Sequence, residues 1–208
     1  MSLSKEITKI IFRFLDKNLS SSFYPKLINR NSSKMYKNNY KVSDDFDYIF
    51  VHIPKTGGMT LNNIIDSINS RLQNKKLYKG GHNPISLFHS MNEKKYFTVI
   101  RDPIDRVYSF FNMALNDKKQ TYNYLAKKGL YDFTAYCEES QNTYCKFFSG
   151  EIEKNVNDDT YKLAEENIKK FFKIINFSNY EKDLRKFFNN IGHENIEIPH
   201  INISKKND

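Results

Sequence analysis

The sequence has very little cysteine, with two in 208 residues. Cys137 and Cys145 lie eight positions apart, with neither a CxxC pair nor a histidine at a metal-site spacing. This pattern favours ordinary reduced thiols over a disulfide or a metal site. A chain of this length buries roughly 70% of the surface that its unfolded form exposes. It therefore needs no disulfide and no structural metal to fold.

Long apolar runs are also missing, although a membrane-spanning helix needs roughly 20 apolar residues. Five charged residues interrupt the apolar stretch near the N-terminus: Lys5, Glu6, Lys9, Arg13 and Asp16. The same charges break up the apolar core that a secretion signal requires. We therefore expect a cytoplasmic protein without a Golgi-type membrane anchor.

Arginine is scarce in a chain that is otherwise basic. Lys and Arg total 33 against 24 Asp and Glu, a net charge of +9, yet only six of the 33 are Arg. A positive surplus favours an anionic partner. Readers of nucleic acid rely on Arg for bidentate contacts, and no nucleic-acid motif occurs, so we expect no nucleic-acid partner. The surplus falls in residues 1–115, with 18 basic and 9 acidic residues, whereas residues 116–208 carry 15 of each.

The first 45 residues differ from the rest of the chain. Residues 4–19 place apolar side chains at helical spacing with charges opposite, which predicts an amphipathic helix. We favour a helix that packs on the domain, and the alternative is a helix that contacts a membrane surface or a partner. Residues 20–45, rich in Ser, Asn and Lys, predict an irregular linker. Residues 46–208 are predicted to form one domain of ordinary size.

Strand patterns alternate with helix patterns within residues 46–208. Because such alternation produces parallel sheets, we predict an α/β domain with a central parallel sheet flanked by helices. The predicted strands are 46–53, a short strand end at 77–81, 96–100 and 172–177. The predicted helices are 60–74, one that follows the turn 101–105, 120–128, 132–148, 158–171 and 179–190.

The turn after the first strand has the chemistry of an anion site. Its sequence, HIPKTGGMT over residues 52–60, joins the end of a strand to the start of a helix. Backbone N–H groups and the positive end of the helix dipole face an anion there, and glycines allow close approach. Lys55 adds a mobile charge. The lysine precedes the glycines, unlike the GxxxxGK[ST] loop, and no acidic magnesium partner is evident, which disfavours a kinase.

The turn after the strand 96–100 offers a second anion site. Arg101 leaves the strand end and can form a two-pronged contact with a phosphate, and Ser109 adds a hydroxyl about two helical turns later. Asp102 suits the N-cap and Pro103 the first helical position. Arg106 is a candidate second phosphate contact or a salt-bridge partner of a neighbouring aspartate. Two such turns predict a ligand with two separate phosphate-like groups.

The two turns together resemble the cofactor loops of the carbohydrate sulfotransferases, in the branch of heparan sulfate 2-O-sulfotransferase and its small bacterial relatives. HIPKTGG and VIRDPIDRVYSFF carry the resemblance, and weaker echoes at 81–82, 141–150, 172–181 and 199–204 extend it over residues 46–204. It implies a P-loop-like three-layer sandwich and the sulfuryl donor 3′-phosphoadenosine 5′-phosphosulfate (PAPS). It assigns the 5′-phosphosulfate to Lys55, Thr56, Gly57, Gly58, Met59 and Thr60, and the 3′-phosphate to Arg101 and Ser109. Met59 departs from the Ser or Thr that is usual in the family.

The resemblance also implies a reaction. A hydroxyl of an acceptor, expected to be a carbohydrate, attacks the sulfur of PAPS in line, and Lys55 stabilises charge on the leaving phosphate. His82, in a Gly-His pair that matches the family's catalytic pair, is the expected general base. We interpret His52 as structural, His89 as part of a helix, and His193 and His200 as surface or structural. No metal is expected, and the alternative is a non-catalytic module that binds a nucleotide or an anionic glycan.

Overall fold

The structure is a computed structural model that describes residues 46–71, 77–88, 94–152 and 155–199. The predicted N-terminal helix and linker, together with His89 and His200, lie outside the described residues. The described residues form two compact units: a larger one of residues 46–110 and 142–199, and a smaller one of residues 111–141. Within the described ranges, no helix is long and apolar enough to cross a membrane.

A parallel sheet of four strands, in the order β2-β1-β3-β4, forms the centre of the larger unit. The register pairs Tyr48 with Leu77 and with Lys95, and Phe97 with Lys173. The strands are β1 (Tyr48–Val51), β2 (Leu77–Lys79), β3 (Lys95–Ile100) and β4 (Lys173–Asn176). All four predicted strands are confirmed, each within a few residues of its predicted ends.

Helices connect these strands and follow the predicted order. Both β1 and β3 lead through a short turn into a 14-residue helix. The α-helices are α3 (Gly58–Arg71), α4 (Pro103–Asn116), α5 (Asn123–Lys128), α6 (Leu130–Tyr136), α7 (Thr143–Ser149), α8 (Asp158–Ile168) and α9 (Tyr180–Asn190). Short 3₁₀ turns are η2 (Ile85–Leu87) and η3 (Phe177–Asn179).

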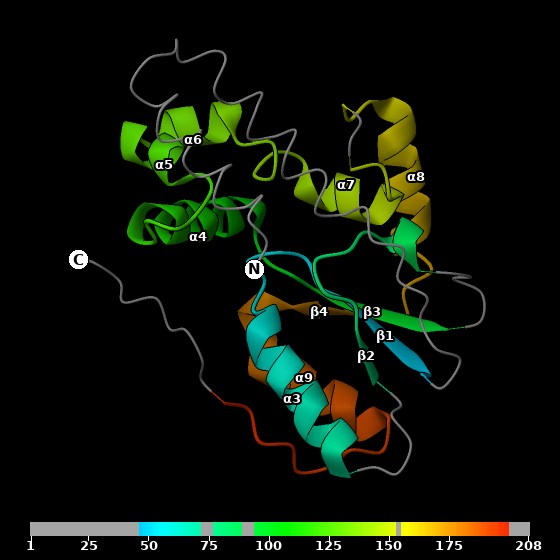
Figure 1. The fold of residues 1–208 in the computed structure, drawn as a ribbon. Coiled ribbons are helices and arrows are strands. Elements are labelled where there is room, and N and C mark those ends of the chain that lie inside the picture. Colours follow the sequence, from blue (N-terminus) through cyan, green and yellow to red (C-terminus); the bar gives the residue numbers. More distant parts are fainter. Residues whose placement is uncertain (1–45, 72–76, 89–93, 153–154, 200–208) are drawn as a thin grey trace, which may run out of the picture. The chain divides into compact units, whose positions relative to one another are not determined.

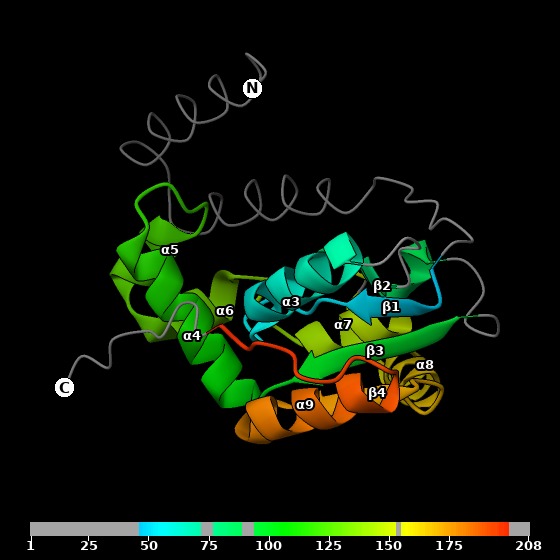
Figure 2. The same cartoon turned by 90° about the horizontal axis from the view of Figure 1, so that it is seen from below.

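The larger unit has three layers, with α3 and α9 on one face of the sheet and α7 and α8 on the other (Figure 1). Figure 2 separates α3 from α9, which overlap in Figure 1. Phe50, Phe97 and Ile175 are buried in one apolar core with side chains of α3 and α9. On the opposite face the Tyr96 ring lies 6.0 Å from that of Phe171. This arrangement confirms the predicted α/β fold with a central parallel sheet and helices on both sides.

The prediction of one helix over 132–148 is wrong, because two helices occupy this segment. α6 ends at Tyr136, and Asn142 has a left-handed φ of 48° immediately before α7. The Gln141 side-chain amide donates to the carbonyls of Thr134 and Ala135, at 2.8 and 2.9 Å. These bonds satisfy carbonyls that a helix end leaves without partners, which stabilises the break.

The smaller unit contains the end of α4 together with α5 and α6. Asn123, at the start of α5, donates to the carbonyls of Ala114 and Leu115 at 2.7 and 3.1 Å and so caps the end of α4. The rings of Phe111 and Phe133 meet edge to face at 5.6 Å. The unit thus has its own small apolar centre.

Cys137 and Cys145, one in each unit, are free thiols, as predicted.

Candidate functional site

The turn between β1 and α3 is held tightly from within. The Thr56 hydroxyl is buried and donates to the Ile53 carbonyl at 2.8 Å. Lys55 has a positive φ of 69°, and Gly57 has one of 83°. A Cβ on Gly57 would also lie 2.7 Å from the Phe177 ring, so only glycine fits there. The strained turn brings the Lys55 backbone and the first amides of α3 to the end of the sheet.

His52 lies beneath this turn in contact with a second histidine. A Cβ on Gly58 would come within 2.0 Å of the His52 Nε2 atom, so the imidazole occupies the space that glycine leaves. The ring is only 6% exposed and stacks on the Phe50 ring at 5.3 Å. The His82 ring meets it edge to face at 4.4 Å. His52 therefore supports both the loop and His82, which agrees with its predicted structural role.

The turn between β3 and α4 begins with Arg101 and a capped helix. The Asp102 carboxylate accepts from the backbone N–H groups of Ile104 and Asp105 at 2.9 and 3.0 Å, which confirms the predicted N-cap. The Tyr144 hydroxyl donates to the Arg101 carbonyl at 2.6 Å and accepts from its N–H at 3.0 Å. The Arg101 main chain is therefore fixed at both of its polar groups.

The Arg101 side chain has a buried donor that the described residues leave unsatisfied. Its guanidinium carbon lies 4.7 Å from the centroid of the Phe177 ring. Its Nε atom is buried and has no hydrogen-bond partner in the described part of the chain. An unsatisfied buried donor is costly, and a charged ligand atom is a suitable partner for it. Arg101 therefore has the properties of an anion-binding residue.

Several of the predicted site residues lie close enough together for the charge of one to affect the pKa of the next. Burial, and secondly the charge of Arg101, lower the pKa of Lys55. His82 is solvent-exposed, but protein atoms surround much of its ring; this desolvation, and then the charge of Lys55, lower its pKa. Burial, and secondly His82, lower the pKa of His52 to about 3. Lys55, Arg101 and His82 therefore converge at the carboxyl ends of three adjacent strands.

Other predicted site residues have less distinctive surroundings. Thr60 is 7% exposed, in the first turn of α3, whereas the Met59 side chain is 60% exposed. Ser109 lies in α4 and is partly buried. Arg106 is 2% exposed, with its guanidinium carbon 5.9 Å from the Tyr144 ring.

Three aromatic residues at the site were missed by the sequence prediction. Tyr144 fixes Arg101, Phe177 packs on the Arg101 guanidinium, and the Tyr180 hydroxyl donates to the Gly57 carbonyl at 2.7 Å. All three lie in the segments 141–150 and 172–181, which resemble family motifs. That resemblance was the signal that could have found them.

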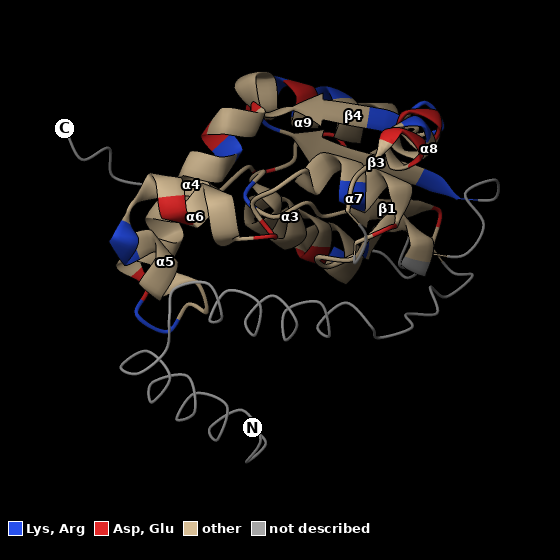
Figure 3. Cartoon of the chain, turned by 90° about the horizontal axis from the view of Figure 1, so that it is seen from above, with Lys and Arg blue, Asp and Glu red and all other residues tan. Residues whose placement is uncertain are grey.

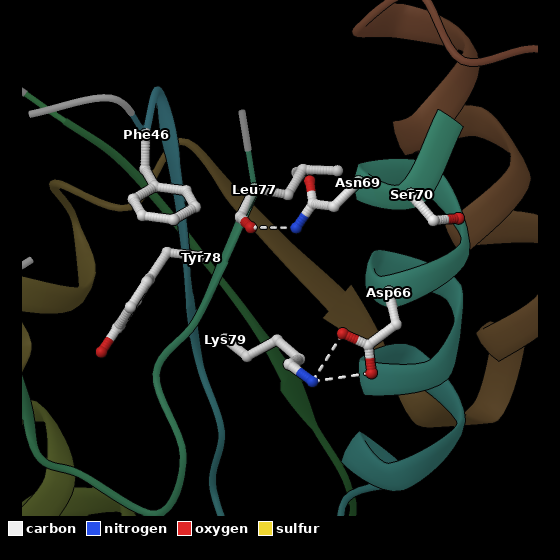
Figure 4. Close-up of a pocket in the computed structure, with 7 residues that line it drawn as sticks. All are labelled: Phe46, Asp66, Asn69, Ser70, Leu77, Tyr78 and Lys79. Atoms are coloured by element: carbon white, nitrogen blue, oxygen red, sulfur yellow. Dashed lines mark hydrogen bonds and ion pairs between the residues drawn. The ribbon is translucent and has the colours of Figure 1, made fainter. Parts of the chain in front are cut away.

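A hollow of about 390 Å³ lies elsewhere, lined by Phe46 just before β1, by the three residues of β2 and by the second half of α3 (Figure 4). Its charged residues neutralise each other, since Lys79 Nζ lies 2.6 and 2.7 Å from the two Asp66 carboxylate oxygens. The Asn69 amide donates to the Leu77 carbonyl at 2.7 Å. This hollow lacks the unbalanced positive charge of the strand-end site.

Balanced charge is also seen away from the site. Figure 3 shows acidic and basic residues close together on α8, and Lys169 forms an ion pair with Glu165 at 2.9 Å. Arg185 forms another with Glu181 at 2.8 Å. Among the described residues, no group of three or more His, Cys, Asp or Glu could hold a metal ion.

A parallel sheet with cationic strand-to-helix turns is typical of α/β proteins that bind phosphate-bearing ligands. A sequence model described as "Sulfotransferase family" matches residues 38–208, and the chain belongs to the sulfotransferase family. Among solved structures, mouse sulfotransferase SULT7A1 complexed with PAP is similar, with a TM-score of 0.32 and 15% identity over 65% of this chain and 70% of that chain. No curated protein sequence matches. The assignment to an enzyme family rests on the sequence model.

Proposed function

We propose that this sulfotransferase moves a sulfuryl group from PAPS to a hydroxyl of a carbohydrate acceptor. The observation that carries the proposal is the convergence of Lys55, Arg101 and His82 at one edge of the sheet, where the charge of Arg101 adds to the effect of burial on the pKa of Lys55 and the charge of Lys55 adds to that on the pKa of His82. Family membership supplies the reaction class. The resemblance of both loops to the heparan sulfate 2-O-sulfotransferase branch supports a carbohydrate as acceptor.

The two turns fit a donor with two anionic groups. Lys55 and the backbone N–H groups of residues 56–60 would hold the 5′-phosphosulfate. The Met59 side chain points to solvent, so its backbone N–H would be able to bind this group. Arg101, whose Nε lacks a partner, would hold the 3′-phosphate with Ser109. A bound anion favours the charged form of Lys55 and so opposes the effect of burial on its pKa.

PAPS would supply the sulfuryl group and a phosphate leaving group. His82 takes the proton of the acceptor hydroxyl as the new O–S bond forms and the bond from sulfur to the leaving phosphate oxygen breaks. Its lowered pKa keeps the imidazole neutral, and therefore able to accept a proton, at pH 7. Lys55 stabilises the charge that develops on the leaving oxygen.

Ligand-induced stabilisation tests the donor. Adenosine 3′,5′-bisphosphate, the desulfated product, should raise the melting temperature, because a ligand at 100 times its Kd adds about 2.7 kcal/mol to the unfolding free energy. ATP with magnesium should raise it much less. An equal response to both would show a generic phosphate site and refute the donor assignment.

Turnover on a panel of sugars then tests the reaction. His82→Ala should bind the bisphosphate normally and lose sulfated product, whereas the matched variant His193→Ala, beyond the far end of α9, should keep both. Near-normal turnover by His82→Ala would remove His82 as the base. Bisphosphate binding without sulfation of any acceptor would instead indicate a binding module.

A further inference from the structure

The turn that follows β4 contacts both anion-binding turns at once. Phe177 begins η3, directly after the strand, and Tyr180 begins α9. The Tyr180 hydroxyl reaches the Gly57 carbonyl of the first turn at 2.7 Å. The Phe177 ring lies 4.7 Å from the guanidinium carbon of Arg101 in the second turn. The two rings also contact each other, with centroids 5.3 Å apart.

We propose that Phe177 and Tyr180 act as an aromatic brace that fixes the spacing between the Gly57 turn and Arg101, so that the site selects ligands with two anionic groups over ligands with one. The proposal rests on the function proposed above, because it concerns how that site recognises its donor. Neither residue is proposed to touch the reacting atoms, so both are positioning residues.

The brace restricts the position of Gly57, because both of its rings contact the backbone of the first turn. The position of a Cβ on Gly57 lies 2.7 Å from Phe177 Cε2 and 3.3 Å from Tyr180 Cζ, so both rings lie directly against that backbone. Burial raises the pKa of the Tyr180 phenol, so the hydroxyl stays protonated and remains a donor to the carbonyl. A donated hydrogen bond together with ring contact restricts movement of Gly57 toward or away from η3.

The brace also sets the direction of the Arg101 side chain. Tyr144 fixes only the Arg101 main chain, so the guanidinium orientation depends on its contact with Phe177. Stacking uses the flat face of a guanidinium and leaves its N–H edges for an anion. The Arg101 Nε atom has no hydrogen-bond partner in the described part of the chain, so this edge of the guanidinium is available to a ligand anion.

A fixed spacing matters only for a ligand that reaches both turns. The second anionic group then binds as part of the same molecule, with an effective concentration that is high when the sites have the right separation and falls when they do not. Loosening the brace should therefore weaken a bisphosphate much more than a monophosphate, which uses one turn at a time. General damage to the fold would weaken both alike.

The test compares Kd values from calorimetry for adenosine 3′,5′-bisphosphate, 5′-AMP and 3′-AMP. Tyr180→Phe removes only the hydroxyl, and Phe177→Leu removes the aromatic face but keeps an apolar side chain. Each should weaken the bisphosphate by about tenfold and each monophosphate by less than about threefold. The matched controls are Tyr161→Phe on α8, where the tyrosine is 58% exposed, and Phe172→Leu, where the phenylalanine is 48% exposed. Both control variants should have the Kd values of the wild type for all three ligands.

Two results would overturn the brace. In one, both brace variants keep the wild-type preference for the bisphosphate; in the other, they weaken all three ligands equally. Failure of the proposed function looks different, because the wild-type protein itself would then show no preference for the bisphosphate over the monophosphates. That result would remove the brace along with the donor assignment.

Discussion

Replacing Gly58 by alanine tests how closely the start of α3 approaches His52. The new methyl would lie 2.0 Å from Nε2, 2.1 Å from Cδ2 and 2.6 Å from Cε1 of the imidazole. These distances are far below the roughly 3.5–4.0 Å of a normal carbon contact. The ring has no easy way to move, because it stacks on Phe50 at 5.3 Å and meets His82 at 4.4 Å.

The size of the effect follows from two opposing contributions. Overpacking a buried site costs about 1–3 kcal/mol. Alanine is favoured over glycine inside a helix by about 0.5–1 kcal/mol, which offsets part of that cost. We expect Gly58→Ala to lower the unfolding free energy by about 1–2 kcal/mol and the melting temperature by about 2–8 °C for a chain of this size.

A second substitution shows whether His52 is the cause. In the His52→Ala background the methyl enters space that the imidazole has left, so Gly58→Ala should be neutral or slightly stabilising. Urea unfolding of the two single variants and the double variant gives a coupling energy, expected at about 1–3 kcal/mol. Costs that simply add, within about 0.5 kcal/mol, would refute the contact between Gly58 and His52 as the source of the effect.

Two further predictions concern stability. Asp102→Ala should remove the N-cap of α4 and cost about 1 kcal/mol, seen in thermal melts as about 2–4 °C, whereas Asp105→Ala should cost less because Asp105 only faces the helix dipole. His52 has a pKa of about 3 when folded, below its usual 6.5, so its contribution to stability is complete above pH 6.5 and is lost as the pH falls toward 3. From pH 7.5 to 5.5 this loss is about 1.4 kcal/mol in urea unfolding, and an unchanged slope in His52→Gln would contradict it.

The pattern of apolar residues along the sequence was sufficient to predict most of the fold. Apolar runs and helical spacing reflect which face each segment buries, so the strands, most helices and the Asp102 cap could be predicted. The predicted helix over 132–148 was wrong because the apolar spacing continues across the break. That break depends on the left-handed φ of Asn142 and on contacts of the Gln141 side chain, which periodicity does not reveal.

The sequence by itself determined the class of this protein, because a strand, a PKTGG turn and a helix are consecutive residues whose chemistry can be read in order. It also predicted Lys55 and Arg101 as the main cations of the candidate site. Only the tertiary structure decided which distant residues complete the site. Tyr180 bonds to Gly57 across 123 positions of sequence, and the His52–His82 contact joins the ends of two separate strands. Such pairings arise when strands align in a sheet, and no local pattern along the chain encodes them.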